Sequence, residues 1–286
     1  MILISSVIVL GSIYALLGAG FVIIYRASRI LNFAHADIVM LAGYLAIAVS
    51  GFIANPFIGL FVVLSLSFLV GLFAYALLIR PLGGYSTLSV IILTVAMGVV
   101  FNALAILGWR GDMEVIPLSW RAYYSFPGGV RFSSAEILSV IIVFIFFVVI
   151  GLFYRYSKTG QQIRATAERP LLAAQRGVKI YLISGLAWGM GFAAAGLAGV
   201  LLGINYTVSL QMGEIAIVAF VVALVGGLDS LWGTIPAAFI IAVTKQLAIV
   251  YINPRLADTI PFIILLLILI FKPWGLFGTE EEIDRV

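Results

Sequence analysis

The sequence predicts an all-α integral membrane protein, a polytopic bundle of eight or nine transmembrane helices that forms one domain over residues 1–286. Of the 286 residues, 64% are hydrophobic and only 10% are charged. The mean hydropathy of +1.23 exceeds what a soluble surface tolerates. The 29 glycines and 9 prolines are spread through the apolar stretches, as is typical of packed transmembrane helices and not of fibrous or disordered chains.

Nine apolar stretches are candidates for these helices, because a bilayer core about 30 Å thick needs about twenty apolar helical residues. In chain order they are residues 2–25, 30–53, 57–79, 87–108, 135–154, 181–203, 215–228, 234–252 and 259–271. The first has no basic segment before it and no small-residue cleavage pattern after it, so we expect a retained helix and not a signal peptide. The seventh and ninth are short, so we expect tilted, broken or re-entrant segments there, and eight spans are nearly as well supported as nine.

The longest basic loop, residues 155–180, predicts the orientation of the chain in the membrane. It carries six basic residues and one acid, namely Arg155, Lys158, Arg164, Arg169, Arg176, Lys179 and Glu168. Connecting loops that are rich in lysine and arginine lie on the cytoplasmic side, so we expect this loop there. Alternation from this loop also places five further basic residues inside, namely Arg26, Arg29, Arg80, Lys272 and Arg285. We therefore expect an external N-terminus, a cytoplasmic C-terminus and an odd number of crossings in a cell membrane.

The loop at residues 109–134 falls outside on this topology. It is rich in aromatic residues and is interrupted by Pro117 and Pro127. Aromatic side chains concentrate at the level of the lipid headgroups. We expect a hairpin or short helix lying on the membrane surface.

Several classes of function are excluded or disfavoured. The chain has no cysteine and one histidine, His35, which argues against a metal site and a cysteine nucleophile. It has no P-loop and no serine hydrolase motif, so we expect no enzyme activity and no cofactor in this chain. The net charge of +4 is accounted for by the cytoplasmic loops and indicates contact with membrane lipid, not with nucleic acid.

The cytoplasmic loop contains a candidate docking helix. Pro170 suits a first helical turn, alanine and leucine follow it, and Gly177 suits a helix end. A loop with only a topological role would not need small apolar residues, so we favour a helix that docks another protein over a solvated loop. The candidate coupling residues are Arg164, Ala165, Thr166, Ala167, Glu168, Leu171, Ala173, Ala174 and Gly177.

Four blocks along the chain carry a family resemblance. They are GSIYAL at residues 11–16 with ILNFAHAD at 30–37, RATA at 164–167 with Gly177, VGGLDSLWG at 225–233, and FKPWGLFG at 271–278. In this order they resemble the permease subunits of branched-chain amino-acid ABC importers of the LivH type. The sequence departs from that pattern at Ala36, Asp229 and Lys272, which leaves the substrate open among branched-chain and other small amino acids and amides.

The resemblance implies a set of partners. A similar second permease, identical or different, would pair with this chain, and two ATPase subunits and an extracytoplasmic substrate-binding protein would complete the importer. ATP and Mg²⁺ would bind the ATPases. The cytoplasmic helix at residues 167–177 would then fit a cleft on an ATPase.

An internal similarity also favours a transporter. HADIVMLA from His35 can be set against MGEIAIVA from Met212, so that an acid opens an apolar helix in both segments. The two helices run in opposite directions on the predicted topology. Inverted repeats of this kind are a recurrent transporter design, with the site near the repeat interface.

Polar residues inside the apolar stretches are the candidates for a translocation path, because buried charge needs partners or water. They are Asn32, His35, Asp37, Asn102, Glu214 and Asp229. Asn32 and His35 are three residues apart and would share a helical face. For each candidate the alternative is an interhelical hydrogen bond or a position at a helix end, and we expect Lys245 to be structural. The alternative function is a stand-alone secondary transporter or channel that couples to ions through these acids.

Overall fold

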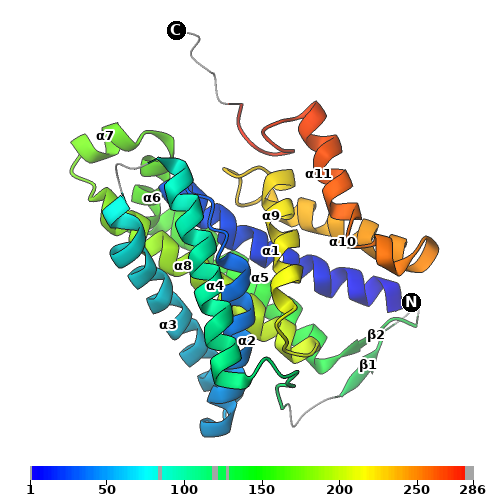
Figure 1. Ribbon diagram of the computed structural model, residues 1–286. Coiled ribbons are helices and arrows are strands. Elements are labelled where there is room, and N and C mark those ends of the chain that lie inside the picture. Colours follow the sequence, from blue (N-terminus) through cyan, green and yellow to red (C-terminus); the bar gives the residue numbers. More distant parts are fainter. Residues whose placement is uncertain (1, 83–85, 118–121, 127–128, 281–286) are drawn as a thin grey trace.

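The computed structural model describes residues 2–82, 86–117, 122–126 and 129–280, which form eleven α-helices and one small hairpin (Figure 1). Trp120 and Arg121 of the external loop, together with Arg285, lie outside the described residues. The loop at residues 155–180 and the C-terminal segment lie at one end of the bundle, and the hairpin lies toward the other (Figure 1). This arrangement agrees with the predicted alternation of loops.

Seven of the described helices are long and apolar enough to cross a membrane. They are α1 (Ile2–Ser28), α2 (His35–Phe52), α3 (Pro56–Ala74), α4 (Thr87–Trp109), α5 (Ser134–Tyr156), α8 (Ile180–Asn205) and α10 (Thr234–Tyr251). Two shorter apolar helices, α9 (Met212–Gly226) and α11 (Ile260–Phe271), correspond to the two stretches expected to be short. All nine stretches are helical, and a count of eight or nine crossings stays a prediction.

Local sequence signals explain where several helices begin. The Asn55 side chain accepts a hydrogen bond from the Phe57 N–H at 3.0 Å, with Pro56 as the first residue of α3. Ser133 and Glu136 form a reciprocal capping box at the start of α5. Such caps satisfy N–H groups that have no partner within the helix. The apolar stretches therefore start within a few residues of where the sequence places them.

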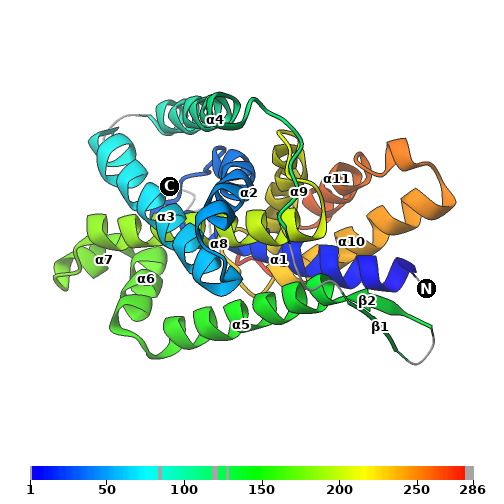
Figure 2. The same ribbon diagram turned by 90° about the horizontal axis from the view of Figure 1, so that it is seen from below.

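The core of the bundle is made by α1 and α8. These two spans are 89% and 83% buried over their apolar windows, against 28% for α3 and α5. Figure 2 shows α1 and α8 between α4 and α5, which lie at opposite edges of the molecule. Glycines permit the close packing: a Cβ on Gly191 would lie 2.9 Å from the Gly20 carbonyl oxygen.

The external loop contains the expected hairpin. Strands β1 (Tyr123–Ser125) and β2 (Arg131–Ser133) pair antiparallel, and Tyr123 and Tyr124 are exposed. The hairpin is the one element that departs from an all-α description among the residues described. A backbone hydrogen bond connects this loop with the segment before α9, since the Glu114 N–H donates to the Val208 carbonyl oxygen at 2.9 Å.

The start of α2 differs from the predicted start of the second apolar stretch. The helix begins at His35, and residues 29–34 before it are not helical. Asn32 and His35 therefore do not share a helical face. The Asn32 Oδ1 atom accepts the Ala34 N–H at 3.1 Å, and this local hydrogen bond competes with helix formation.

Candidate functional site

The starts of α2 and α9 meet. A Cβ on Gly213 would lie 4.0 Å from the Ala36 carbonyl oxygen, and the chain before α2 reaches α9 where the Phe33 and Phe220 rings lie 5.7 Å apart. A Cβ on Gly43, further along α2, would meet Val208, which precedes α9. The two helices are therefore antiparallel. We call this meeting point the α2–α9 crossing.

Both helices of the crossing begin with the same pattern. α2 starts at His35 and α9 at Met212, so the two segments aligned by sequence enter their helices in register. The third helical residue is an acid in each, Asp37 and Glu214. A carboxylate is favoured there because the first turn of a helix carries partial positive charge. Asp37 is half-buried and Glu214 is exposed on this chain.

The start of α2 lies well inside the span of α1. A Cβ on Gly20 would lie 2.6 Å from the His35 ring. Gly20 is eight residues, about 12 Å of helix, from the end of α1 at Ser28. α2 thus begins beside the middle of α1 and not at its end. Helix starts of this kind form binding sites in transporters with inverted repeats.

His35 and Asn32 are the most enclosed of the candidate residues. The His35 side chain is fully buried and touches the Phe21 ring, with centroids 4.3 Å apart. Neither its ring nitrogens nor the Asn32 Nδ2 atom has a hydrogen-bond partner among the described residues. The His35 ring packs next to Gly20 of α1, where α8 also approaches. Asn32 stabilises the turn before α2.

A polar stripe on α4 faces the crossing. The Thr94 Oγ1 atom accepts the Phe33 N–H at 3.2 Å, and the Asp37 carboxylate packs against the backbone of Gly98. Asn102, one turn further on, donates to the Met40 sulfur at 3.8 Å. The sequence singled out Asn102 but missed Thr94 and Gly98. Their spacing of four residues from one another and from Asn102 was the signal, since it places all three on one face of a helix.

The cytoplasmic loop folds into two helices, α6 (Lys158–Glu168) and α7 (Pro170–Gln175). Pro170 opens α7, and Gly177 follows it with φ +82°, so the helix expected there is present. The helix α6 was not predicted. Leu171 is 79% exposed, whereas Ala173 is buried against the chain itself.

These two helices are joined to the end of α1. The Arg29 Nη2 atom donates to the Ala167 carbonyl oxygen at 3.2 Å. The end of α1 is in turn fixed to α8, since the Ser184 hydroxyl donates to the Ala27 carbonyl oxygen at 3.1 Å and the Trp188 Nε1 donates to the Ser28 hydroxyl at 3.2 Å. From Arg29 the chain runs through residues 30–34 into the crossing.

The comparison with known families decides which transporter this is. The sequence profile of the family described as branched-chain amino acid transport system, permease component, matches residues 3–269. The chain belongs to this family. The match covers three of the four sequence blocks, confirms the family resemblance and makes the chain a non-catalytic permease component, not a stand-alone carrier.

Relatives match this permease over nearly its whole length. It is 27% identical to the high-affinity branched-chain amino acid transport system permease protein BraD of Pseudomonas aeruginosa, over 96% of this chain and 94% of the relative. It is 26% identical to LivH of Escherichia coli strain K12, over 98% and 95%. A solved structure titled PsaBC from Streptococcus pneumoniae in complex with Fab aligns at 13% identity and a TM-score of 0.48, over 93% of this chain and 91% of that one.

Two of the sequence blocks of the permease interlock at the far end of α9. The Leu276 N–H donates to the Val225 carbonyl oxygen at 2.8 Å, and the Phe277 N–H donates to that of Gly226 at 3.1 Å. We call residues 272–279 the C-terminal strap. Gly227 adopts φ +102° at the contact, and a Cβ there would lie 2.5 Å from the strap backbone. Glycine is required because it alone tolerates both conditions.

Asp229 belongs to this interlock. Its Oδ2 atom accepts the Thr279 N–H at 2.9 Å and also the Thr279 hydroxyl. Asp229 follows the C-terminal end of α9, whereas Glu214 lies at its start. The structure therefore brings Asn32, His35, Asp37, Asn102 and Glu214 toward the crossing and does not bring Asp229 with them.

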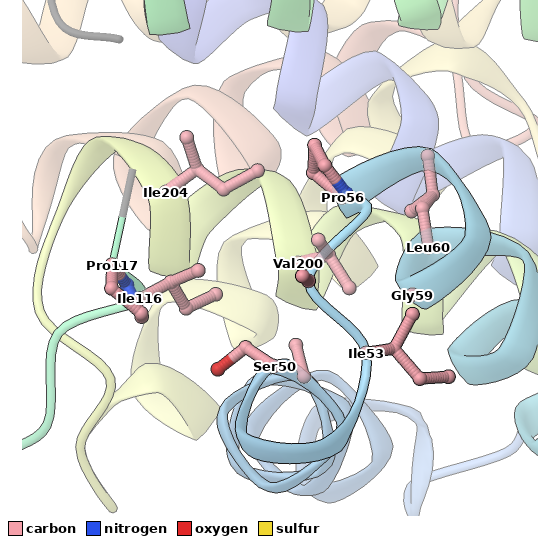
Figure 3. A pocket seen from close by; sticks show the side chains of 11 residues that line it. Ser50, Ile53, Pro56, Gly59, Leu60, Ile116, Pro117, Val200 and Ile204 are labelled. Carbon is pink, nitrogen blue, oxygen red and sulfur yellow. The ribbon is translucent and has the colours of Figure 1, made fainter. Parts of the chain in front are cut away.

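An apolar cavity of about 410 Å³ opens at the other end of α2. Figure 3 shows Ile53 of the α2–α3 connection, Pro56 at the start of α3, and Val200 and Ile204 of α8 around this cavity. None of the candidate polar residues lines it. Within the described residues no group of three or more histidines and acids is placed to hold a metal ion.

Proposed function

We propose that this permease provides the translocation path of an ATP-driven importer for branched-chain or other small amino acids or amides, and that the α2–α9 crossing lines this path. The observation that supports the proposal is that α2 and α9 begin next to each other, each with an acid in its first turn. Glu214 is exposed on the isolated chain, where a second permease, identical or different, would cover it.

The chemistry of the crossing suits a zwitterion with an apolar side chain. The carboxylates of Asp37 and Glu214 can receive the ammonium group, and the Phe33 and Phe220 rings give an apolar wall. Few polar contacts keep binding weak, which allows release. On this proposal, substrate selection rests mainly with the extracytoplasmic binding protein.

The helices α6 and α7 would dock the ATPases, of which two, carrying ATP and Mg²⁺, complete the importer. Exposed Leu171, Leu172 and Ala174 offer the apolar surface for this contact, and the Arg29 to Ala167 hydrogen bond connects it with the end of α1. With α6 and α7 on the cytoplasmic side, the N-terminus would lie outside and the C-terminus in the cytoplasm.

Uptake by the reconstituted importer tests the path. We expect Glu214→Gln or Asp37→Asn to lower the rate of branched-chain amino acid uptake about tenfold, because a hydrogen bond to a charged group contributes about 1.5 kcal/mol or more. The relative competition by different amino acids should not change while the binding protein is held constant.

The matched control is Asp112→Asn, since Asp112 is exposed on the external loop and its backbone carbonyl, not its side chain, receives the Tyr44 hydroxyl. Full uptake in both crossing variants would place the path elsewhere. A severalfold change in substrate preference would show that the permease itself selects the substrate.

A further inference from the structure

A separate cavity of about 340 Å³ lies where the end of α1 meets α6 and α7. Three arginines line it, Arg26, Arg29 and Arg80, against one acid, Glu168. It is on the face of the bundle that the proposed topology makes cytoplasmic. A basic cavity between helices at that face is suited to a phosphate group.

Two of the arginines of this cavity, Arg26 and Arg80, stack on aromatic rings. Within the part of the chain that the structure describes, no acid pairs with Arg26 or Arg80. The Arg26 guanidinium lies over the Tyr154 ring at 5.8 Å from its centroid, and that of Arg80 lies over the Tyr181 ring at 4.5 Å. Stacking on a ring orients a guanidinium and leaves the N–H groups at its edge able to donate.

A buried hydroxyl gives an independent indication of a ligand. Thr166 lines the cavity and is 4% exposed, yet its Oγ1 atom has no hydrogen-bond partner among the described residues. A buried hydroxyl without a partner is costly. An oxygen of a bound phosphate would accept its proton.

The cavity is also lined by apolar side chains next to Arg80. They are Ile79, Leu82 and Val90, at the end of the α3 segment and the start of α4. A π-helical turn, Tyr75–Ile79, precedes Arg80 and contributes Ile79 to this lining; such turns are frequent at functional sites. Basic and apolar side chains together at a membrane surface match a lipid headgroup with its acyl chains, whereas a soluble phosphate would gain nothing from the apolar residues.

We infer that this cavity binds one anionic phospholipid, with Arg26, Arg80 and the Thr166 hydroxyl on its phosphate and the acyl chains along Ile79, Leu82 and Val90. Because Ala167, Glu168 and Pro170 also line the cavity, the lipid bridges α6 and α7 to the end of α1. The site does not depend on which substrate the permease transports.

Native mass spectrometry of the purified full-length permease tests the site, with phosphatidylglycerol and phosphatidylcholine as probes. We expect retention of one phosphatidylglycerol and little phosphatidylcholine. Arg26→Gln and Arg80→Gln should each weaken phosphatidylglycerol retention about fivefold, since one basic residue near a membrane surface contributes about 1 kcal/mol.

The matched control is Arg155→Gln, which removes an exposed arginine in the last turn of α5 that does not line the cavity. Thr166→Val preserves the shape of the side chain, and we expect it to weaken phosphatidylglycerol retention with an unchanged melting temperature. Glycerol 3-phosphate, the headgroup chemistry without acyl chains, should not displace the lipid at millimolar concentration.

Three results would overturn the inference. Equal retention of the two lipids would show that the cavity does not distinguish an anionic headgroup from a zwitterionic one. An equal loss in Arg155→Gln would show a general surface effect, and displacement by glycerol 3-phosphate would show a site for a soluble phosphate. None of these results bears on uptake, so this test and that of the transport path fail independently.

Discussion

The two ends of α9 place an acid in opposite situations. At its start, Glu214 is exposed and faces away from the packed core. Beyond its other end, Asp229 accepts two hydrogen bonds from Thr279 in an interlock built around glycines. An acid with its partners supplied by the same chain stabilises the fold, whereas the exposed Glu214 is the one we propose to contact a ligand or another subunit. Sequence position alone does not separate the two cases.

Among the variants that test this comparison, Gly227→Val in the interlock should have the largest effect on stability. Valine is strained at φ +102° and its Cβ would meet the strap backbone, so we expect a loss of about 3 kcal/mol or more in the free energy of unfolding. Size-exclusion chromatography of the detergent-extracted protein should show mostly aggregate. Gly51→Ala is the control, because a Cβ there meets nothing within 4 Å; a well-behaved Gly227→Val protein would show that the strap is dispensable.

A smaller and more discriminating effect is expected from Asp229→Ala. Loss of the acceptor for Thr279 should lower stability by about 1 kcal/mol, or about 2 °C in the melting temperature, because the site is partly open to solvent. Uptake per folded importer should stay near that of the wild type. Glu214→Gln should show the reverse, with slow uptake and an unchanged melting temperature. If Asp229→Ala slowed uptake tenfold at normal stability, Asp229 would belong to the path.

The sequence predicted the helices far better than the site. Nine helices were predicted because apolar length is a local signal, and caps at Asn55 and Ser133 fix the starts of two of them. The break before His35 was missed because the apolar stretch continues through residues 30–34, and the Asn32 hydrogen bond that ends it is visible only in three dimensions. Burial of Ala173 likewise depends on contacts outside its own helix.

The polar stripe of α4 was missed for a related reason. Thr94 and Gly98 carry no charge and are common in transmembrane helices. Their spacing from Asn102 places them on its helical face, and the structure adds that they contact Phe33 and Asp37. The acids Asp37 and Glu214 were found from sequence, since each opens an apolar helix, but their proximity rests on how α2 and α9 pack.

The smallest expected effect tests whether this stripe belongs to the path or to the scaffold. Thr94→Val removes the acceptor of the Phe33 N–H, and a hydrogen bond between membrane helices contributes about 0.6 kcal/mol, so the melting temperature should hardly change. Phe33 belongs to the short segment that leads into α2, and greater freedom there should slow uptake about twofold. Thr244→Val is the matched control, because its hydroxyl donates within its own helix, to the Ile240 carbonyl oxygen at 2.7 Å. Equal slowing in both variants would mean that any threonine loss perturbs the permease, and the α4 stripe would then be part of the scaffold, like the interlock at the far end of α9.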